Sequence, residues 1–529
     1  MFIKKLLRYK YFLPWLVFFI AIIPRLINLF GYPYLENDEG AYTSQAWWMV
    51  NFGKLAPYTY WYDHAPFGWL TIGFWQKLTA GPLTFGLSLY STRIFMTLVA
   101  GLTNLLIYQL IVYLTKNKKI AFLSCLIYSL SALAITYQRR VLLDNLETFW
   151  LMLSLWYFFK AKNRLNFIWL SAIFFGLAFL SKESIVFLLP VMLYGIWLTV
   201  SKENRRFSLM IWLVTSLFLI LLFPLLAFLK KEFFPASWFG SQSHVSFLET
   251  VFYQMGRGTE FKPWQEESSF FINVVSWFKK DFLLLAFGVW SIVVNILLNW
   301  KDKNNRIIVL LSLFFLIFLA RGGLVLQFYI LPLLPLLILN IALTLSLGEK
   351  RFKKQIDWLL SLPRFSLVVI LLGIAFISED IAIYTAQPAK KQVEAVVFVK
   401  NNLKTDDFIV IDDFCFSDLR LAKGENKAFT NAEWFWKVEQ DKEIREDKLA
   451  NDWRNIDYIL LSGEMRRKLL SGELPFLRQA FDNAVLIKDF PSDDLHEGGE
   501  VIDLGREGDG WQALFKVEKE AGFEKIISQ

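Results

Sequence analysis

The stretch from Phe207 to Leu229 reads FSLMIWLVTSLFLILLFPLLAFL and contains no charged side chain. A helix of about 20 apolar residues is long enough to cross the hydrocarbon core of a bilayer. Because the backbone has no water to bond there, such a run crosses as a helix or as a barrel strand, and the length of this run and its lack of alternation exclude a barrel strand. The stretch therefore predicts a membrane-spanning helix.

Runs of the same kind recur through the first three quarters of the chain, which has 529 residues and is 55% hydrophobic. The first run has a basic flank and no small-residue cleavage site, so we expect a retained anchor helix rather than a removed signal peptide. A polytopic α-helical membrane protein with about eleven spans is predicted. The expected spans are 11–30, 91–114, 119–137, 141–159, 165–181, 184–200, 207–229, 282–299, 306–320, 323–347 and 364–384.

The short loops between these runs carry most of the basic residues. If the N-terminus is cytoplasmic, every expected inner loop is basic, as the positive-inside rule requires, and an odd number of spans places the C-terminus outside. We therefore expect a multi-pass protein of the plasma (inner) membrane. A net charge of +8 distributed in this way argues against nucleic acid as a partner, because it does not form a phosphate-tracking groove. The basic inner loops lie near residues 116–119, 160–164, 202–206, 301–306 and 350–354.

The composition changes near Gln387. From there the chain is charged and has no run of membrane length, but it contains short segments rich in β-branched and apolar residues, with helix-like stretches such as Gln392 to Leu403 between some of them. Strands alternating with helices indicate a small α/β domain. We predict a transmembrane domain of residues 1–386 and an extracytoplasmic α/β domain of residues 387–529. The expected strands lie at 408–411, 458–461, 484–487 and 514–517.

Two adjacent carboxylates, Asp38 and Glu39, follow the first apolar run, and the charge bias places them outside the membrane. One interpretation is a solvated loop start, with Glu36 as a third surface acid. The other is a general base, because a carboxylate in a partly desolvated pocket can have its pKa raised toward the working pH and can take a proton from an acceptor hydroxyl. From the residues alone, the two interpretations have about equal weight.

Six basic residues break the positive-inside pattern, because each lies near an outer helix end or in an outer loop. One explanation is that their long side chains reach lipid headgroups. The other is a shared cationic pocket for a phosphate, where Arg supplies bidentate contacts and Lys a point charge. Several exceptions on one side favour a lipid-phosphate site. They are Arg93, Arg139, Arg140, Lys182, Arg257 and Arg321.

Asp144 lies inside an apolar run near its outer end, where an ionisable residue is a functional-site hypothesis. An ion pair with Arg140, four residues earlier on the same helix face, explains it equally well. His64 follows Asp63 in the first long outer loop and could place a substrate or bind a metal loosely, although only three histidines occur in the chain, which supports a zinc site weakly. No P-loop, dinucleotide-binding glycine pattern or nucleophile elbow occurs, so a nucleotide site is not indicated.

In their order and spacing, these motifs resemble those of the membrane-embedded GT-C glycosyltransferases, and more narrowly those of the protein O-mannosyltransferase and lipid A aminoarabinose transferase superfamily. Ala41, His64 and Ala65 depart from the aminoarabinose transferases, which leaves the sugar and the acceptor open. The C-terminal tail resembles the outer α/β domains of some bacterial members. The matching motifs are Asp38-Glu39 with Tyr42, Asp63-His64-Ala65-Pro66-Phe67, Arg93 with Gly101, Arg140 with Leu143-Asp144, Leu180-Ser181-Lys182 with Pro190, and Gln327-Phe328-Tyr329-Ile330-Leu331-Pro332 with Pro335.

The resemblance implies an inverting glycosyltransferase that passes a sugar from a polyprenyl-phosphate donor to an extracytoplasmic acceptor, which is a protein, a lipid or a cell-envelope glycan. It implies Asp38 as the general base, with Glu39 orienting the acceptor or supporting Asp38. No cofactor is required by such a reaction, and a weakly bound divalent metal is compatible with it. The implied donor-phosphate ligands are Arg93, Lys182, Arg257 and Arg321, and the implied substrate-positioning residues are Tyr42, Asp63, His64, Arg140, Asp144 and Tyr329.

Three alternatives stay open at this point. One is a catalytically inactive scaffold of the same architecture, against which the intact Asp38-Glu39 pair argues. Another is an oligosaccharyltransferase or arabinosyltransferase of the same fold. The third is a lipid-linked sugar flippase or another transporter, which often shows repeated halves and helices broken at the bilayer midplane. The ionisable residues of this chain gather at one face, which favours an enzyme at the membrane surface. Membrane lipids are expected partners of all these proteins.

Overall fold

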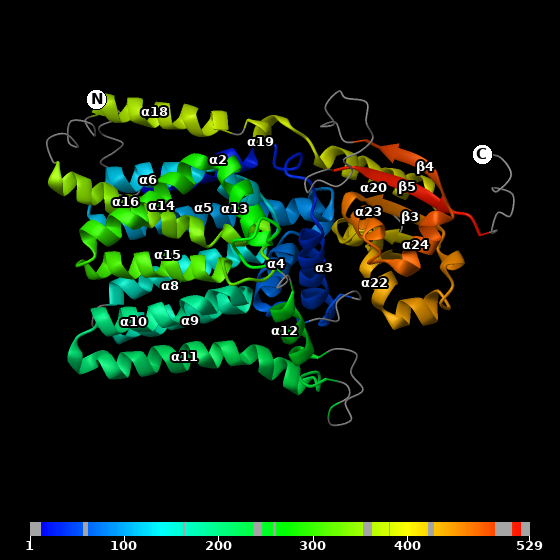
Figure 1. The fold of residues 1–529 in the computed structure, drawn as a ribbon, viewed down its shortest axis with the longest axis horizontal. Coiled ribbons are helices and arrows are strands. Elements are labelled where there is room, and N and C mark those ends of the chain that lie inside the picture. Colours follow the sequence, from blue (N-terminus) through cyan, green and yellow to red (C-terminus); the bar gives the residue numbers. More distant parts are fainter. Residues whose placement is uncertain are drawn as a thin grey trace. The chain divides into compact units, whose positions relative to one another are not determined.

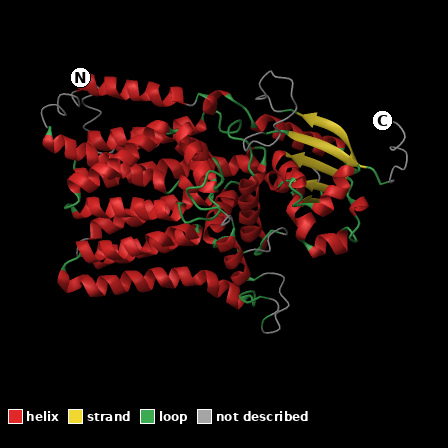
Figure 2. Ribbon diagram, in the orientation of Figure 1, coloured by secondary structure: helices red, strands yellow, loops and turns green. Residues whose placement is uncertain are grey.

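The computed structural model of the protein describes residues 12–56, 62–161, 164–235, 238, 246–257, 261–352, 362–379, 381–421, 428–491 and 510–519. The chain divides into two compact units (Figure 1). Met1–Ile27, Tyr60–Trp69 and Met96–Ile381 form the first unit, and Asn28–Thr59, Leu70–Phe95 and Ala382–Gln529 form the second. Helices fill the first unit, whereas the second combines helices with a β-sheet (Figure 2).

Each of the expected spans coincides with a helix of the structure or with two consecutive helices. The helix α5 is shared, because its first two turns belong to the second unit. The helices of the first unit are α2 (Phe12–Leu26), α5 (Ser88–Thr115), α6 (Lys118–Leu130), α7 (Ala132–Arg139), α8 (Leu143–Ala161), α9 (Leu165–Ser181), η2 (Glu183–Leu188), α10 (Leu189–Thr199), α11 (Lys202–Leu229), α12 (Phe247–Gly256), α13 (Ser269–Lys280), α14 (Phe282–Asn299), α15 (Lys303–Leu319), η3 (Gln327–Ile330), α16 (Leu333–Arg351) and α18 (Leu362–Glu379).

Four helices in the described part of the chain are long and apolar enough to cross a membrane, or six if each of two bent helix pairs is one span. The four are α5, α11, α14 and the continuous stretch of η3 and α16. In one bent pair, α6 and α7 meet at 62° around Ser131, whose hydroxyl accepts a hydrogen bond from the backbone N–H of Ala134. The chain is a helical membrane protein, while the number of spans and their orientation stay predictions.

Glycines let neighbouring helices of the first unit approach closely at several crossings, including those at Gly101 and Gly176. A Cβ on Gly101 of α5 would lie 2.8 Å from the ring of Phe18 on α2. A Cβ on Gly176 of α9 would lie 2.5 Å from the side chain of Leu219 on α11. Any larger side chain would push these helices apart, since small residues are what allow close packing of membrane helices. Gly101 is the small residue that the sequence motif pairs with Arg93.

The second unit contains a five-stranded mixed sheet of order β2-β1-β3-β5-β4. β1 (Ile409–Ile411) pairs in parallel with β2 (Ala432–Trp434) and with β3 (Tyr458–Ser462). β5 (Gln512–Val517) pairs antiparallel with β3 and with β4 (Ala484–Phe490). The four expected strands are confirmed. The sequence analysis missed β2, which has three residues and includes a glutamate, so it lacks the apolar run that marks the others.

Helices of this unit precede the sheet in the chain and lie between its first four strands. The expected helix from Gln392 to Leu403 is confirmed as α20 (Ala389–Asn402). The domain boundary predicted at residue 387 lies five residues from Ala382, where the chain re-enters the second unit, and it stays a prediction. The helices of this unit are α3 (Asn37–Phe52), most of α4 (Phe67–Leu78), η1 (Pro82–Phe85), α19 (Ala382–Thr385), α20, η4 (Asp413–Cys415), α21 (Phe416–Arg420), α22 (Phe435–Gln440), η5 (Glu443–Lys448), η6 (Trp453–Asn455), α23 (Gly463–Leu470) and α24 (Pro475–Asp482).

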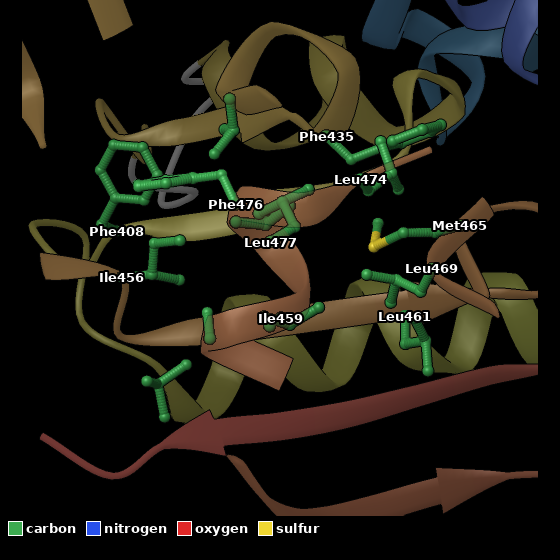
Figure 3. Packing of buried hydrophobic residues seen from close by; sticks show 14 of the residues in the cluster. Phe408, Phe435, Ile456, Ile459, Leu461, Met465, Leu469, Leu474, Phe476 and Leu477 are labelled. Atoms are coloured by element: carbon green, nitrogen blue, oxygen red, sulfur yellow. The ribbon is translucent and has the colours of Figure 1, made fainter. Parts of the chain in front are cut away.

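A hydrophobic core packs on one face of the sheet (Figure 3). Ile459 and Leu461 of β3 alternate along the strand and point to this face, as the two-residue period of a strand requires. They belong to one buried cluster with Phe435 of α22 and Leu477 of α24. Full burial of each such side chain stabilises the fold by about 1.5–3 kcal/mol, so the cluster gives the sheet and its helices a core of their own.

Candidate active site

The Asp-Glu motif lies at the start of α3, in the second unit. The helix begins at Asn37, after Glu36 in an extended conformation (φ −101°, ψ 151°). Asp38 and Glu39 therefore sit in the first turn, where carboxylates interact favourably with the positive end of the helix dipole. Tyr42, one turn further on, is buried, as is Glu39. The motif thus has the fixed backbone of a helix rather than that of a solvated loop.

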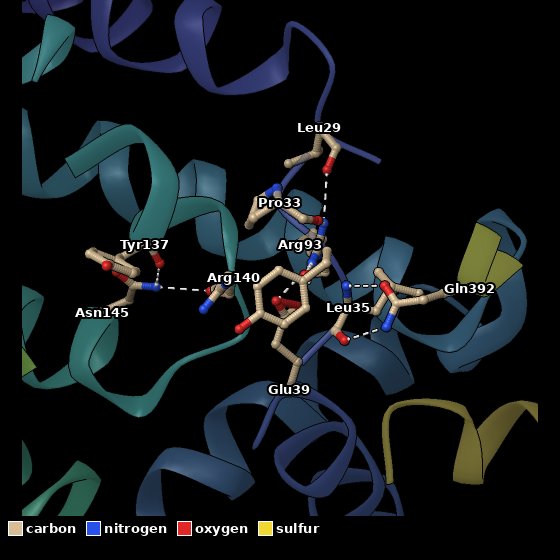
Figure 4. Close-up of polar contacts among 10 residues, drawn as sticks. Leu29, Pro33, Leu35, Glu39, Arg93, Tyr137, Arg140, Asn145 and Gln392 are labelled. Atoms are coloured by element: carbon tan, nitrogen blue, oxygen red, sulfur yellow. Dashed lines mark hydrogen bonds and ion pairs between the residues drawn. The ribbon is translucent and has the colours of Figure 1, made fainter. Parts of the chain in front are cut away.

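Glu39 forms a fully buried ion pair with Arg93 (Figure 4). Nε of Arg93 lies 2.8 Å from Oε2 of Glu39, and Nη2 lies 2.8 Å from Oε1, so the contact is bidentate. The other N–H groups donate to the backbone carbonyls of Leu29, Pro33 and Tyr34. Such forked pairs are strong and geometrically specific. The pair fixes the first turn of α3 against the start of α5 and the segment before α3.

The sequence predicts that Arg93 binds the donor phosphate, but acceptors of the protein itself already surround its guanidinium. A guanidinium has five N–H donors. In this structure Glu39 takes two of them and backbone carbonyls take the other three. The side chain is also 0% exposed. In this structure Arg93 holds Glu39, a contact that sequence reasoning did not foresee, and binding of the donor phosphate by Arg93 stays a prediction.

Three predicted site residues come together in the first unit. Nζ of Lys182 lies 2.7 Å from Oδ2 of Asp144 and 4.2 Å from the centre of the Tyr329 ring. Lys182 ends α9, Asp144 lies in the first turn of α8, and Tyr329 lies in η3. The Lys182 and Asp144 side chains are only 4% and 2% exposed. The structure therefore joins residues from three separate sequence motifs in one buried cluster, which we name the lysine cluster.

A buried acid that the sequence analysis did not select lies beside the lysine cluster. Glu147, one turn after Asp144 on α8, interacts electrostatically with both Asp144 and Lys182. One of its oxygens accepts a hydrogen bond from Ser184, and within the described residues the other has no hydrogen-bond partner. Its position inside an apolar run, which selected Asp144 as a candidate, could also have selected Glu147.

The Asp63-His64 motif lies next to Lys182. Nδ1 of His64 lies 3.0 Å from Oε2 of Glu183, the residue that follows Lys182. Burial lowers the pKa of His64, but the Glu183 carboxylate more than reverses this, so the pKa is raised above its ordinary value. Asp63 accepts a hydrogen bond of 3.1 Å from the side chain of Gln254. Sequence reasoning missed Glu183, although its position beside Lys182 was visible.

Arg257 and Arg321 lie in neighbouring loops of the first unit. The backbone N–H of Leu324 donates to the carbonyl of Arg257 at 2.9 Å, which joins the two loops. The guanidinium of Arg321 donates to the carbonyls of Phe318 and Leu324 and interacts electrostatically with Tyr329. Lys182, Arg257 and Arg321, which are three of the four predicted phosphate ligands, therefore belong to adjoining parts of one unit.

Arg140 follows α7, in the turn that leads to α8. Its carbonyl accepts a hydrogen bond from the side chain of Asn145, which also donates to the carbonyl of Tyr137 (Figure 4). The guanidinium lies 5.8 Å from the centre of the Tyr137 ring. Arg140 is 5% exposed, so it does not extend toward lipid headgroups. Because Arg140 lies before α8 begins, it does not share a helix face with Asp144, and the pairing that the alternative interpretation required on one helix is wrong; Asp144 forms its ion pair with Lys182.

Metal binding has no preformed site in the part of the chain that the structure describes, since no three His, Cys, Asp or Glu side chains there gather closely enough to hold an ion. The prediction that a divalent metal binds weakly is not tested by this arrangement.

Buried acids from the C-terminal part of the second unit lie close to α3. Burial raises the pKa of Asp412 to about 8, and the neighbouring Glu464 carboxylate adds to the effect. Burial also raises the pKa of Asp413, with further contributions from Asp412 and from Asp38. Among the described residues, neither oxygen of the Asp413 carboxyl has a hydrogen-bond partner. The folded protein therefore favours the protonated form of these acids.

This predicts a pH-dependent stability. An unfolded Asp has a pKa of about 3.9, so between that value and the raised folded value the folded state binds more protons than the unfolded state. Stability is then fully present below about pH 4 and is lost as the pH rises toward about 8. We expect the melting temperature of the purified protein to fall between pH 6 and pH 9, and Asp412→Asn, which mimics the protonated acid, to flatten that slope. Asp482→Asn, at an exposed acid, is the control. Equal slopes in all three proteins would contradict the prediction.

Comparison with known proteins identifies the fold. The family described as dolichyl-phosphate-mannose-protein mannosyltransferase matches residues 63–228. ArnT from Cupriavidus metallidurans, solved bound to undecaprenyl phosphate, has a TM-score of 0.60 at 13% identity, covering 96% of this chain and 98% of that one. The oligosaccharyltransferase AglB from Archaeoglobus fulgidus, solved with an inhibitory peptide and a dolichol-phosphate, has a TM-score of 0.55 at 14% identity, covering 88% and 72%. No curated protein sequence matches the chain significantly.

These likenesses place the chain, by its fold, in the GT-C glycosyltransferase superfamily. Within that class, its sequence is similar to the protein mannosyltransferases over residues 63–228, which include the Asp63-His64 motif, Asp144 and Lys182. The resemblance seen in the motifs is thus confirmed at the level of the superfamily. The identity of each site residue stays a proposal.

Proposed function

We propose that this protein is an integral-membrane glycosyltransferase that moves a sugar from a polyprenyl-phosphate donor to an extracytoplasmic acceptor. The observation that carries the proposal is the lysine cluster, in a chain that shares its fold with proteins solved with undecaprenyl phosphate and with a dolichol-phosphate. A buried ammonium at the end of an apolar helix suits the phosphate of a lipid whose tail lies in the bilayer.

The cations of the first unit are proposed to stabilise the leaving group. As the acceptor oxygen bonds to the anomeric carbon, the bond from that carbon to the phosphate oxygen breaks, and the lipid phosphate departs with the electron pair. Lys182 and Arg321 both interact electrostatically with Tyr329, and Arg257 lies in the loop adjoining Arg321. Preorganised charges of this kind stabilise a developing anion without reorganising during the reaction. Asp144 holds the ammonium of Lys182 in place.

Asp38 is proposed to be the general base that receives the proton of the acceptor hydroxyl while the anomeric carbon is inverted. Glu39 supports it, because the ion pair with Arg93 fixes the helical turn that both acids share. Tyr42, Asp63, His64 and Arg140 are proposed to position substrates. In the proposed orientation the N-terminus is cytoplasmic and the reaction takes place on the outer face of the plasma membrane.

The test is mass spectrometry of envelope lipids, glycans and proteins from cells with and without this protein. A transferred sugar appears as a mass difference on its acceptor, which identifies sugar and acceptor together. The purified protein should then transfer that sugar from the matching polyprenyl-phosphate donor. Identical profiles, together with no transfer by the purified protein, would contradict the proposal.

A lipid-linked sugar transporter is the second candidate, and one observation favours it. The bent pair of α6 and α7 is a broken helix, which is common in transporters. Liposomes that contain the purified protein and a labelled polyprenyl-phosphate sugar separate the two functions. Movement of the label across the bilayer without transfer to any acceptor would favour the transporter.

A further inference from the structure

One face of α3 lies against a short segment of the C-terminal part of the second unit. We name this the docking segment, and it consists of residues 412–420, which include η4 and α21. The residues of α3 that make the contact are spaced three, four and four positions apart, which places them on one side of a helix. They are Asn37, which bonds to the Asp412 side chain, Gly40, Ser44 and Trp48.

The contact at Gly40 is the closest one. A Cβ on this residue would lie 2.1 Å from the carbonyl oxygen of Asp413 and 2.5 Å from Cα of Phe414. Both atoms belong to backbone and cannot rotate away. The hydroxyls of Ser44 and Ser417 lie 2.8 Å apart one turn further along. Only glycine allows α3 to approach the docking segment so closely.

The same part of the chain also holds the start of α5, which carries Arg93. The carboxylate of Asp418 accepts hydrogen bonds from the backbone N–H and the hydroxyl of Ser88, at 2.9 and 2.7 Å. Ser88 is 0% and Asp418 2% exposed. The docking segment therefore contacts both helices that supply the Glu39–Arg93 ion pair.

A residue of α20 binds the backbone of the segment that precedes α3. The side chain of Gln392 accepts a hydrogen bond from the N–H of Leu35 at 2.6 Å and donates one to its carbonyl at 2.8 Å. Leu35 directly follows Tyr34, and the carbonyls of Pro33 and Tyr34 are two of those that bind Arg93. All three elements around the ion pair are thus fixed by residues that follow residue 388.

From these contacts we propose that the C-terminal α/β part is a positioning element for the Asp38-Glu39 helix, with Asp418 and Gln392 as positioning residues. The inference rests on the proposed function and assigns the α/β part a place in it. A surface that only recognised acceptors would not need buried hydrogen bonds to α3, α5 and the segment between the first span and α3. Catalytic groups must be held closely, because a misplacement of about 1 Å can lower a rate by about 10²-fold.

The test compares two variants at Asp418 with one variant at a remote acid in the same α/β part. Asp418→Ala removes both acceptors of Ser88, whereas Asp418→Asn keeps one acceptor and nearly the same shape. We expect Asp418→Ala to lower kcat by at least about 10-fold while KM for the lipid donor stays within about twofold, and Asp418→Asn to recover most of the rate. Asp482→Ala, at an exposed acid of α24, should leave both constants unchanged.

Hydrogen exchange supplies a readout that does not depend on activity. Amide exchange of α3 should become faster in Asp418→Ala and stay at the wild-type rate in Asp482→Ala. A second variant, Gly40→Ala, should give the same acceleration and lose about 10²-fold in kcat, with Gly348→Ala as its control, since a Cβ at Gly348 meets nothing within 4 Å.

The outcomes separate this inference from the proposed function. Unchanged α3 exchange and unchanged kcat in Asp418→Ala would overturn the positioning role. A change confined to KM for the acceptor would also overturn it and would make the α/β part a recognition module. If the wild-type protein transfers no sugar, the proposed function fails, while the exchange measurement still decides whether the α/β part fixes α3.

Discussion

The Asp38→Asn protein should transfer sugar about 10²–10⁴-fold more slowly than the wild type, because loss of a general base typically has an effect of that size. Asparagine has nearly the same shape as aspartate but does not accept the proton of the acceptor hydroxyl. Asp38 lies in the first turn of α3, which the buried Glu39–Arg93 ion pair holds in place. The variant should therefore fold normally and lose only the chemical step.

The measurement is the initial rate of transfer from a purified polyprenyl-phosphate sugar, with kcat and KM for the donor determined separately. We expect kcat to fall and KM for the donor to stay close to the wild-type value, since the proposed phosphate ligands belong to the first unit. Glu36→Gln, which removes the acid just before the helix, is the matched control. Full activity of Asp38→Asn would remove Asp38 from the mechanism.

The second large effect is expected at Lys182. Lys182→Met leaves the Asp144 carboxylate buried without its ion pair, and breaking such a pair from one side costs about 3–5 kcal/mol of stability. Transfer should be lost as well, because the ammonium is the proposed partner of the departing phosphate. A stability loss alone would explain both results, so the single variant does not separate the two roles.

The double variant Lys182→Met/Asp144→Asn separates them. Removing both charges abolishes the buried unpaired carboxylate, so the melting temperature should return toward that of the wild type. Transfer should stay lost, because the cation is still missing. Binding of undecaprenyl phosphate, measured as the rise in melting temperature on its addition, should also stay weak. A stable and fully active double variant would show that Lys182 has only a structural role.

The sequence predicted those features that depend on local patterns. Runs of apolar residues identified the helices, because their length and uniform hydrophobicity are visible without any tertiary contact. The β-branched and apolar residues of short segments such as Tyr458–Leu461 identified strands in the same way. The three-residue strand β2 has too short a pattern to be found by that reasoning.

The arrangement of the candidate site was predicted in part. Motif order selected Asp144, Lys182 and Tyr329, and the structure brings them together. The pairing of Glu39 with Arg93 was not foreseen, since these residues are 54 positions apart and only the folded chain shows that five acceptors surround the guanidinium. Local pattern carries no information about such partners, which tertiary packing chooses.

The close fit between α3 and the docking segment has a consequence for the order in which the protein is completed. Ser44 and Ser417 touch in the folded protein but are 373 positions apart in the chain. The side of α3 that carries Gly40 and Ser44 therefore cannot pack against the docking segment until most of the polypeptide has been synthesised. We expect premature termination anywhere before Asp418 to leave this helix unsupported, so that incomplete chains have no activity and are open to proteolysis.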